Sequence, residues 1–411
     1  MRKSAFYLLI SFGLLACGTQ TTERSFDSTL LTKASPEQVE QVVEAFILAE
    51  DSSTIEIPEG FYELNTQLIL DNKSAITIKG AGMDKTVLSF RNLKSGGEGV
   101  KIVGNQITIQ DLSIEDAPGD GIKAQHTDGI TFRRVNVTWT NGDKSKNGTY
   151  AIYPVQCKNV LIDECIASHS KDAGIYVGQT NIAKIRKSRA AFNVFGFEIE
   201  NVQDGEYSDN LAECNSGGFL VYDLDNLTQY GSRSRVYNNI SRNNNTYNFA
   251  VPGSIVANVP RGSGLITLAY DKIDIYDNVF ENNGTAGIIL TSYDLLGENG
   301  DRRMDVYSEA VNIFDNTFIN NGNDLPQPDF ASIIATQGAQ ISSAFPLVVG
   351  LKNALGGGGY RGAHIVWDGY NDSLNSSCDL PKDRNGNPVP VDADGKPIQG
   401  NQNPNPSCRY N

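Results

Sequence analysis

Two carboxylates, Glu198 and Glu200, are separated by a single residue in the segment Phe197-Glu198-Ile199-Glu200. On a β-strand both side chains would point to one face, with their Cα atoms about 7 Å apart. Such a pair could act as acid and base on a glycosidic bond if the two pKa values were pushed apart. Asp223, one strand further along, is a third acidic candidate. We therefore take Glu198, Glu200 and Asp223 as the candidate catalytic residues.

Aromatic and polar residues recur at equivalent positions before and after these carboxylates. If each strand begins at a Gly/Ala-Ile pair, its outward positions carry Tyr153, Tyr176 and Tyr222 in different repeats. Sugar rings stack on aromatic faces and sugar hydroxyls need acceptors, so such a face suits a polysaccharide. The full set of candidate substrate-binding residues is Gln125, His126, Tyr153, Tyr176, Tyr222 and Asp225. The alternative is a packing ladder of tyrosines covered by loops, beside carboxylates that are simply hydrated.

The sequence indicates no metal centre. The three histidines, His126, His169 and His364, share no ligand-like spacing, which argues against zinc. Calcium is the one ion that the carboxylate pair would suit.

The elements that would position these residues follow from an internal repeat. A motif of alternating β-branched residues, exemplified by Ile107-Thr108-Ile109-Gln110-Asp111-Leu112, recurs at intervals of 22 to 39 residues. Repeats of this size are typical of solenoids, in which no single coil can bury its apolar side chains alone. Ile109, Phe132 and Ile162 are expected to point inward. Four later copies end in Asn210, Asn239, Asn278 and Asn316, which should stack as a ladder of hydrogen-bonded amides.

The repeat predicts an all-β fold, a single right-handed parallel β-helix of about ten coils over residues 35–376. Ser35-Pro36-Glu37 has the form of a helix start, and apolar residues follow at helical spacing. We expect this helix to cap the first coil, because an open coil exposes a sheet edge. Ala363 to Trp367 is expected as a last strand, and residues 377–411 as an irregular tail.

The N-terminus has the form of a lipoprotein signal. Residues 1–16 combine Arg2 and Lys3 with a short apolar run, and Leu14-Leu15-Ala16-Cys17 matches a lipobox. This predicts an exported lipoprotein of the cell envelope, in the outer membrane, anchored to the membrane by lipid on Cys17, with residues 17–34 as a tether. The net charge of -14 argues against nucleic acid as a partner.

The other five cysteines divide into two groups. An oxidising compartment favours a disulfide between Cys378 and Cys408, which flank the tail. Cys157, Cys165 and Cys214 lie in strand patterns, where free buried thiols are expected.

Several segments resemble the pectate-lyase-like superfamily of right-handed β-helices, and more closely a family of exported parallel β-helix repeat proteins that are often lipoproteins. They include Asp172-Ala173-Gly174-Ile175-Tyr176-Val177-Gly178-Gln179 and Gly217-Gly218-Phe219-Leu220-Val221-Tyr222-Asp223-Leu224. The resemblance implies the fold, and no established activity comes with it. The Gly-His-Gly of polygalacturonases and the Asp-Pro-His of mannuronan epimerases are both missing from the sequence. Arg133, Arg134 and Arg186, unlike the base of pectate lyases, fall on a different face from the tyrosines.

Three hypotheses for function result. The first is recognition of a polysaccharide or glycan on the Tyr/Glu face. The second is a polysaccharide lyase, epimerase or hydrolase that uses the acidic residues. The third is a scaffold for an exported partner protein, since genes of the resembling family tend to sit beside one for another exported protein.

Overall fold

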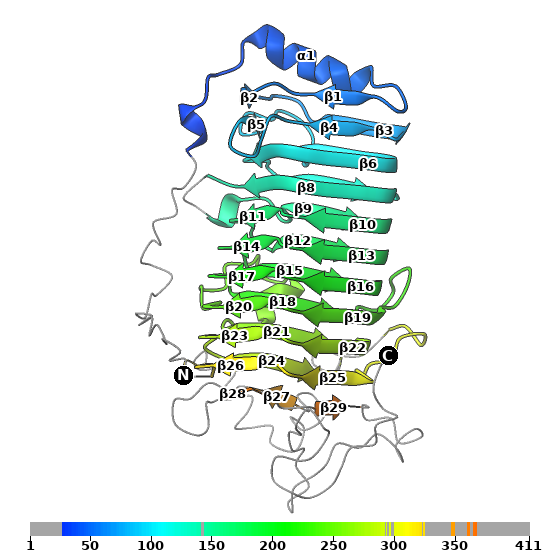
Figure 1. The fold of residues 1–411 in the computed structure, drawn as a ribbon, viewed down its shortest axis with the longest axis vertical. Helices are drawn as coiled ribbons and strands as arrows, with labels where there is room; N and C mark the ends of the chain where they lie inside the picture. Colours follow the sequence, from blue (N-terminus) through cyan, green and yellow to red (C-terminus); the bar gives the residue numbers. More distant parts are fainter. Residues whose placement is uncertain are drawn as a thin grey trace, which may run out of the picture.

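The computed structural model describes residues 27–140, 144–291, 293, 296, 300–322, 324, 347–349, 360–361 and 365–367. Within these residues the chain is a right-handed parallel β-solenoid of about nine turns with one α-helix, which confirms the predicted fold class. Figure 1 shows the coils stacked in sequence order from the N-terminal to the C-terminal end of the molecule.

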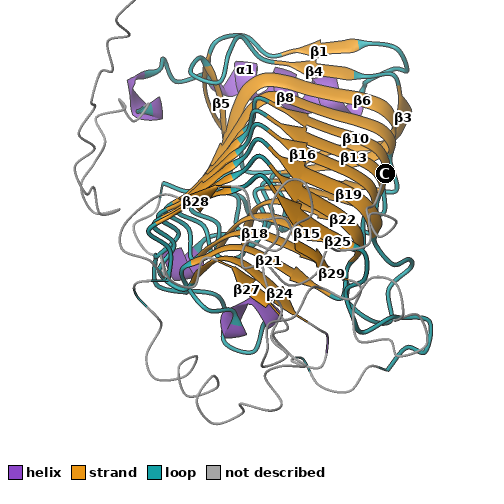
Figure 2. Cartoon of the chain, turned by 60° about the horizontal axis from the view of Figure 1, so that its bottom comes forward, coloured by secondary structure: helices purple, strands orange, loops and turns teal. Residues whose placement is uncertain are grey.

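Each coil contributes strands to three columns, which form separate faces of the solenoid (Figure 2). The first column, which carries the candidate site, consists of β3 (Leu68–Ser74), β7 (Ile122–Gln125), β9 (Ile152–Val155), β12 (Ala173–Gly178), β15 (Phe195–Glu200), β18 (Gly217–Tyr222), β21 (Ser263–Leu268) and β24 (Ala286–Thr291). The second consists of β1 (Thr54–Glu56), β4 (Thr77–Lys79), β10 (Lys158–Asp163), β13 (Asn181–Arg186), β16 (Gln203–Ser208), β19 (Ser232–Tyr237), β22 (Asp271–Tyr276) and β25 (Val311–Phe314). The third consists of β2 (Gly60–Glu63), β5 (Thr86–Ser89), β11 (Ile166–Ser168), β14 (Arg189–Ala191), β17 (Leu211–Glu213), β20 (Ile240–Arg242), β23 (Val279–Glu281) and β26 (Thr317–Ile319).

Two long strands, β6 (Val100–Glu115) and β8 (Asp128–Thr138), bend through more than one column. Three short 3-10 helices lie outside the columns, η1 (Ser28–Leu30), η2 (Lys144–Lys146) and η3 (Ile255–Asn258).

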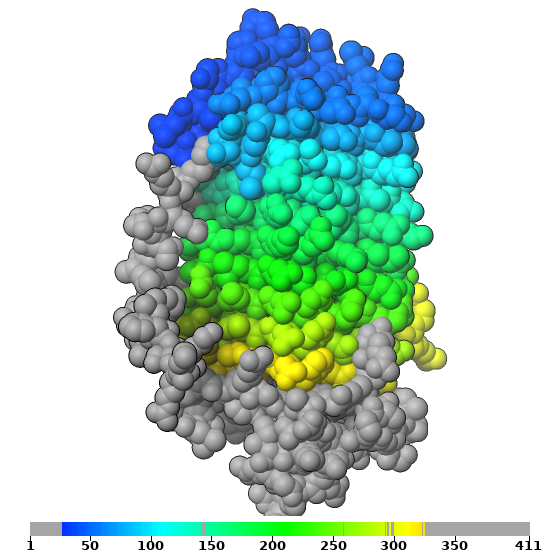
Figure 3. Space-filling view, in the orientation of Figure 1, coloured from blue at the N-terminus to red at the C-terminus, as the bar shows by residue number. Residues whose placement is uncertain are grey.

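In the core, equivalent residues of successive coils stack on one another in rows. In the second column Ile109 pairs with Phe132, and Phe132 with Ile162, so these inward residues stack directly and are buried as the sequence predicted. In the first column Phe197 stacks on Phe219 with ring centroids 4.7 Å apart. Because each residue covers its equivalent in the next coil, the apolar surface of the interior is removed from water along the whole stack. Figure 3 shows the coils closely packed on the outside as well.

Two ladders of buried asparagines line the turns. The side-chain amide of Asn210 donates to Oδ1 of Asn239 (3.0 Å), and the same bond links Asn239 to Asn278 and Asn278 to Asn316 (2.9 Å each). A second ladder runs through Asn193, Asn215, Asn244, Asn283 and Asn321. Each side chain also bonds backbone groups of neighbouring coils, so the buried polar groups of these turns are satisfied.

Both ends of the described solenoid are covered. Helix α1 (Pro36–Ile47) lies across the first coil (Figure 1) and buries Val42 and Phe46. It begins at Ser35 with a capping box to Gln38, as the N-cap signal predicted. At the other end, β27 (Leu347–Val349), β28 (Tyr360–Arg361) and β29 (Ile365–Trp367) pair antiparallel with β24, β26 and β25. Capping in this way removes the unpaired edges that would otherwise invite association.

The cysteines differ in part from the expectation. Cys157 and Cys165 are free and buried. Cys214 is disulfide-bonded, so the expectation of a free thiol there is wrong. The predicted lipidation site Cys17, the predicted Cys378–Cys408 disulfide, the signal peptide and the tail 377–411 lie outside the described residues. In the part of the chain that the structure describes, no helix is long and apolar enough to cross a membrane.

Candidate functional site

The predicted Tyr/Glu row exists on the first column. Parallel pairing aligns Lys123 with Tyr153, Tyr176 with Glu198, and Glu198 with Leu220 in successive coils. Two residues further along the same strands, Gly178 aligns with Glu200 and Glu200 with Tyr222. All these side chains point away from the solenoid interior, as the alternation along the strands predicted.

The expectation that this row forms an open floor is wrong for its C-terminal half. Glu198 is 1% exposed, Tyr176 4% and Tyr222 5%. The insertions between coils fold over them and pack Leu224, Phe249 and Val306 against the outward side chains. The physical reason is that the row continues as Leu220, Ile266 and Ile289, an apolar strip that needs cover. The loops therefore build a second hydrophobic core outside the solenoid.

Asp223 and Asp225 fasten these loops. Asp223 is buried and accepts two bonds from the backbone N–H of Gly231, 2.9 and 2.8 Å long. Asp225 accepts from the hydroxyl of Tyr293 (2.8 Å) and from the N–H of Gly300 (2.9 Å), which ties residues 223–231 to Tyr293 and to residues 300–303. Asp223 is thus a buried structural carboxylate, whereas Asp225 is half-buried and joins two loops. Their catalytic and binding roles stay predictions.

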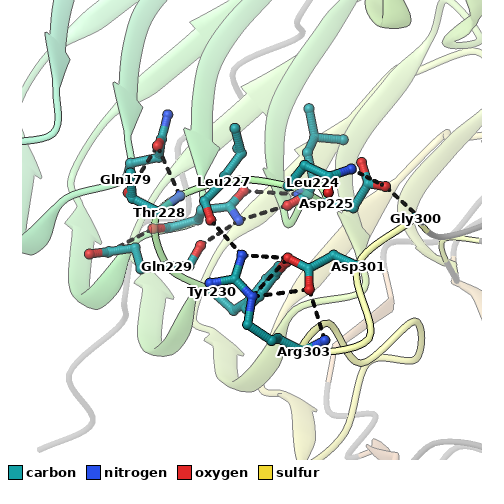
Figure 4. A network of polar contacts seen from close by, with 12 residues as sticks. Gln179, Leu224, Asp225, Leu227, Thr228, Gln229, Tyr230, Gly300, Asp301 and Arg303 are labelled. Carbon is teal, nitrogen blue, oxygen red and sulfur yellow. Dashed lines mark hydrogen bonds and ion pairs between the residues drawn. The ribbon is translucent and has the colours of Figure 1, made fainter.

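Figure 4 shows the other hydrogen bonds and the ion pair that hold these loops together. Arg303 forms an ion pair with Asp301 and donates to the carbonyl of Leu227 (3.2 Å), while the Tyr230 hydroxyl donates to Asp301. On the other side, Thr228 donates to Oε1 of Gln179 (2.9 Å). The loop over β12, β15 and β18 is thus held at both edges.

The cover ends at β9 and β12, where three tyrosines meet. The ring centroids of Tyr150, Tyr153 and Tyr176 lie 4.6 to 4.9 Å apart. Tyr150 and Tyr153 are half-buried, unlike Tyr176 beneath them. The ammonium of Lys123 lies 4.9 Å from the Tyr153 ring centroid. The accessible part of the predicted face therefore consists of Tyr153 and its neighbours from the preceding coils.

Next to these rings lies a group of acidic side chains (Asp120, Asp172, Glu198 and Glu200), which we call the acidic group. Glu200 accepts a hydrogen bond from the Tyr176 hydroxyl, and Glu198 accepts one from Tyr222 (3.3 Å). Asp172 and Glu198 lie near each other, and the Asp172 charge raises the pKa of Glu198 further. Oδ1 of Asp172 and Oε1 of Glu198 are buried and have no hydrogen-bond partner among the described residues.

Burial dominates the electrostatics of the acidic group, because it penalises the charged form of each carboxyl. Desolvation raises the pKa of Glu200 to about 7 and that of Asp120 to about 6. It raises the pKa of Asp172 to about 7, and that of Glu198 well above its usual value, with the Asp172 charge adding to the effect. Acid–base work by Glu198 and Glu200 would need their pKa values pushed apart, whereas burial raises the pKa of both, and both residues lie deeper than expected.

Sequence reasoning missed Asp120, Tyr150 and Asp172. They lie in turns, whereas the search followed outward positions within strands. A signal was present, because Asp120 and Tyr150 immediately precede the Gly/Ala-Ile landmarks of their coils, in Asp120-Gly121-Ile122 and Tyr150-Ala151-Ile152, and Asp172 lies one residue earlier, in Asp172-Ala173-Gly174-Ile175.

The remaining candidates lie at the edge of this surface. Gln125 donates to Gln156 (3.2 Å) and Gln156 to Gln179 (3.4 Å), so Gln125 begins an amide ladder along one turn. His126 is exposed, in a left-handed turn conformation. Arg133 and Arg186 pair with Asp163 on the second column, away from the tyrosines as expected.

No group of three or more His, Cys, Asp or Glu residues is placed to hold a metal within the described ranges. The family model described as "Right handed beta helix region" matches residues 98–233. No curated protein sequence matches the chain.

The solved structures to which this chain is similar have TM-scores below 0.5. The A-module of the mannuronan C-5 epimerase AlgE4 from Azotobacter vinelandii is 17% identical, with a TM-score of 0.49, over 72% of this chain and 76% of that one. The periplasmic alginate epimerase AlgG is 12% identical, with a TM-score of 0.46, over 68% and 77%. A PL6 alginate lyase in complex with a trisaccharide is 14% identical, with a TM-score of 0.42, over 72% and 71%. With TM-scores below 0.5, these likenesses carry no argument about the reaction or substrate of this chain.

Proposed function

We propose that this protein binds a polysaccharide on the surface formed by Lys123, Tyr150 and Tyr153, at the point where the loop cover of the first column ends. The observation that carries the proposal is the pair of half-buried tyrosine rings beside the acidic group. A sugar ring can stack on Tyr153 while its hydroxyl oxygens accept from the ammonium of Lys123, which lies beside that ring.

The architecture favours an extended ligand. Lys101, Lys123 and Tyr153 are equivalent residues of successive coils, spaced by about 4.8 Å along the solenoid. A polymer lying along the axis would meet one side chain of this row per coil. The surface is rigid, because each side chain stands on a paired strand.

The test is retention on a panel of polysaccharides, using the chain without residues 1–17, with and without calcium. Tyr153→Ala should weaken retention about tenfold or more, through loss of a stacking platform. The matched control is Tyr276→Ala, because Tyr276 is a half-buried ring stacked between Tyr237 and Phe314 on the second column. Retention equally reduced by both substitutions, or no retention on any polymer, would contradict the proposal.

The same panel separates the other hypotheses for this surface. New unsaturated ends would indicate a lyase, and a change in sugar configuration without cleavage an epimerase. Dependence on calcium would show that the ion takes part in binding. Co-purification of an exported protein without sugar retention would favour a scaffold.

We further propose that the protein is exported and anchored in the outer membrane by lipid on Cys17. The lipobox of residues 14–17 supports this. Labelling of cells with a radioactive fatty acid should mark the wild type and leave Cys17→Ser unmarked.

A further inference from the structure

We propose that the loop of residues 244–262 inserts its exposed apolar side chains into the surface of the bilayer that holds the lipid on Cys17. The solenoid then lies on the membrane and is held at two points. This inference rests on the lipid anchoring of Cys17 proposed above, and it adds a membrane contact that the anchor alone does not require.

One side of this loop, which we call its outer side, carries apolar side chains that stand in water. Tyr247 is 80% exposed, Val251 51% and Ile255 42%. The inner side of the same loop, with Phe249 and the buried Val256, packs on the second hydrophobic core over the first column. Exposed apolar side chains gathered on a loop that is fixed from beneath are typical of a surface that meets a partner or a membrane.

The absence of charge in the loop sequence favours a membrane. Residues 243–260 contain no Asp, Glu, Lys, Arg or His, although the whole chain has a net charge of -14. The other long loops beside the first column, residues 141–149, 223–231 and 300–310, all contain charged residues. Because a charge in the apolar part of a bilayer is costly, the uncharged loop is the one that can enter it. Tyr247 suits the interface, since its ring can lie in an apolar layer while its hydroxyl reaches water.

The side chain of Asn248 satisfies backbone groups of the loop from within. Its amide donates to the carbonyls of Val256 (2.8 Å) and Val259 (3.1 Å), and its Oδ1 accepts from the N–H of Ala250 (3.1 Å). Backbone groups that enter a bilayer need such partners, because no water replaces them there. The loop can therefore meet lipid without losing these hydrogen bonds.

The N-terminal end of the described chain and the loop lie on the same side of the solenoid. The hydroxyl of Ser28 in η1 donates to Glu115 (2.9 Å), at the end of the part of β6 that runs through the third column. Parallel pairing leads from Glu115 to Arg242 over five coils, or about 24 Å along the axis. The loop starts directly after Arg242. In Figure 1 the dark blue η1 and the labels of β17 and β20 lie on one side of the solenoid.

The tether is long enough to join the anchor to this side of the molecule. The extended chain from Cys17 to Asp27 spans at most about 35 Å, which exceeds the axial distance from η1 to the loop. One membrane plane can therefore hold the lipid of Cys17 and touch the loop, with the solenoid axis along the membrane. A polymer bound along Lys101, Lys123 and Tyr153 then runs parallel to the membrane surface.

The experiment measures contact between the loop and lipid directly. The full chain is reconstituted through its anchor into phosphatidylcholine vesicles whose acyl chains carry bromine near the headgroup, which quenches tryptophan fluorescence on contact. Tyr247→Trp should show a blue-shifted emission and a quenched fraction about threefold or more above that of the wild type, whose own tryptophans are Trp139 and Trp367. The control is Ile182→Trp on β13 of the second column, which should be quenched no more than the wild type.

A charge on the outer side of the loop should remove the contact. Ile255→Asp added to Tyr247→Trp should return quenching to the wild-type value, because a carboxylate does not enter the apolar layer. Ile182→Asp added to the same variant is the matched control, since Ile255 and Ile182 are 42% and 41% exposed. All these side chains stand in water, so the variants should have the far-UV circular dichroism and the urea midpoint of the wild type.

The other outcomes separate this inference from the proposals on which it rests. If Cys17 carries no lipid, the same vesicles are added to the chain without residues 1–17, and the same quenching of Tyr247→Trp is expected. No quenching overturns the inference and leaves polysaccharide binding and the anchoring of Cys17 as they stand. Quenching that survives Ile255→Asp, or equal quenching of Ile182→Trp, overturns the assignment to this loop. Self-association that Ile255→Asp abolishes, without quenching by lipid, overturns the inference in favour of a second copy of the chain.

Discussion

At the scale of single residues, burial decides what each carboxylate can do. Asp163 is held by Arg186 at 2.8 Å, and that hydrogen bond keeps its pKa below the usual value. Glu200 is buried under the loop cover, and desolvation, together with the nearby Asp172 charge, raises its pKa to about 7. The carboxylate of Asp163 on the second column therefore stays ionised, whereas the carboxyl of Glu200 on the first column holds its proton up to about pH 7.

The raised pKa of Glu200 predicts a stability that falls with pH. The folded state holds the proton up to about pH 7, whereas the unfolded chain loses it near its ordinary value of 4.5. The stability present below the unfolded pKa is therefore lost as pH rises toward 7, by up to about 3 kcal/mol. Glu200→Gln, which can still accept from Tyr176, should be more stable than wild type at pH 8 and closer to it at pH 5.

Urea denaturation at the two pH values measures this difference. Glu206→Gln is the matched control, since a hydrogen bond from Tyr237 and contacts with Lys184 lower the pKa of Glu206. Glu206→Gln should lower the free energy of unfolding at pH 8. A gain in Glu200→Gln of the same size at both pH values would show that packing, not ionisation, is responsible.

At the scale of elements, both the strands and the turns repeat from coil to coil. The strands repeat because inward β-branched and aromatic residues stack, and the turns repeat because asparagine amides bond from coil to coil. Asn278 accepts from the amide of Asn239 (2.9 Å) and donates to Asn316 and to the carbonyl of Val236 (2.8 Å).

Asn278→Ala would leave several of these buried groups without a partner. Each orphaned group costs about 1–3 kcal/mol, so we expect a loss of about 3 kcal/mol or more in the free energy of unfolding. Chemical denaturation checks this, with Asn92→Ala, an exposed turn position, expected to change stability by less than about 0.5 kcal/mol. If both variants lost a similar amount of free energy of unfolding, the asparagine ladder would not be a specific source of stability.

The strand periodicity was enough to predict which residues share a face. Tyr176, Glu198 and Leu220 do align, because register in a parallel coil is fixed by the inward rows. The cover over them could not be predicted, since it depends on where residues 223–231, Tyr293 and residues 300–303 fold. Contacts such as Asp225 with Tyr293 join loops from different coils and leave no local pattern.

At the scale of the whole molecule, a solenoid is stable only if its ends are closed. Helix α1 buries Phe46 (2% exposed) on the first coil, and antiparallel strands close the last described coil. Between these caps each coil pairs with the next, and α1 lies over the first coil, whose β1 pairs with β4 alone among the described strands.

Phe46→Asp should open the N-terminal end. Loss of the buried ring costs about 3–5 kcal/mol, and the exposed edge of the first coil should pair with other molecules. We expect concentration-dependent association by sedimentation velocity. Gln41→Asp, on the solvent side of α1, should stay monodisperse at the same concentrations. A monodisperse Phe46→Asp protein of unchanged stability would mean that the helix is dispensable as a cap.

The sequence by itself determined the coil, its register and its cap, because each follows from a local pattern repeated down the chain. Ile109, Phe132 and Ile162 specify the interior, and Ser35 with Pro36 specifies the start of α1. Only the tertiary structure decided which part of the outward face meets water. Tyr176 and Tyr153 have the same residue type and equivalent places, yet one is buried and the other half-exposed. The difference arises from loops whose folding is driven by the apolar strip of Leu220, Ile266 and Ile289, several coils away in sequence but adjacent in the stack.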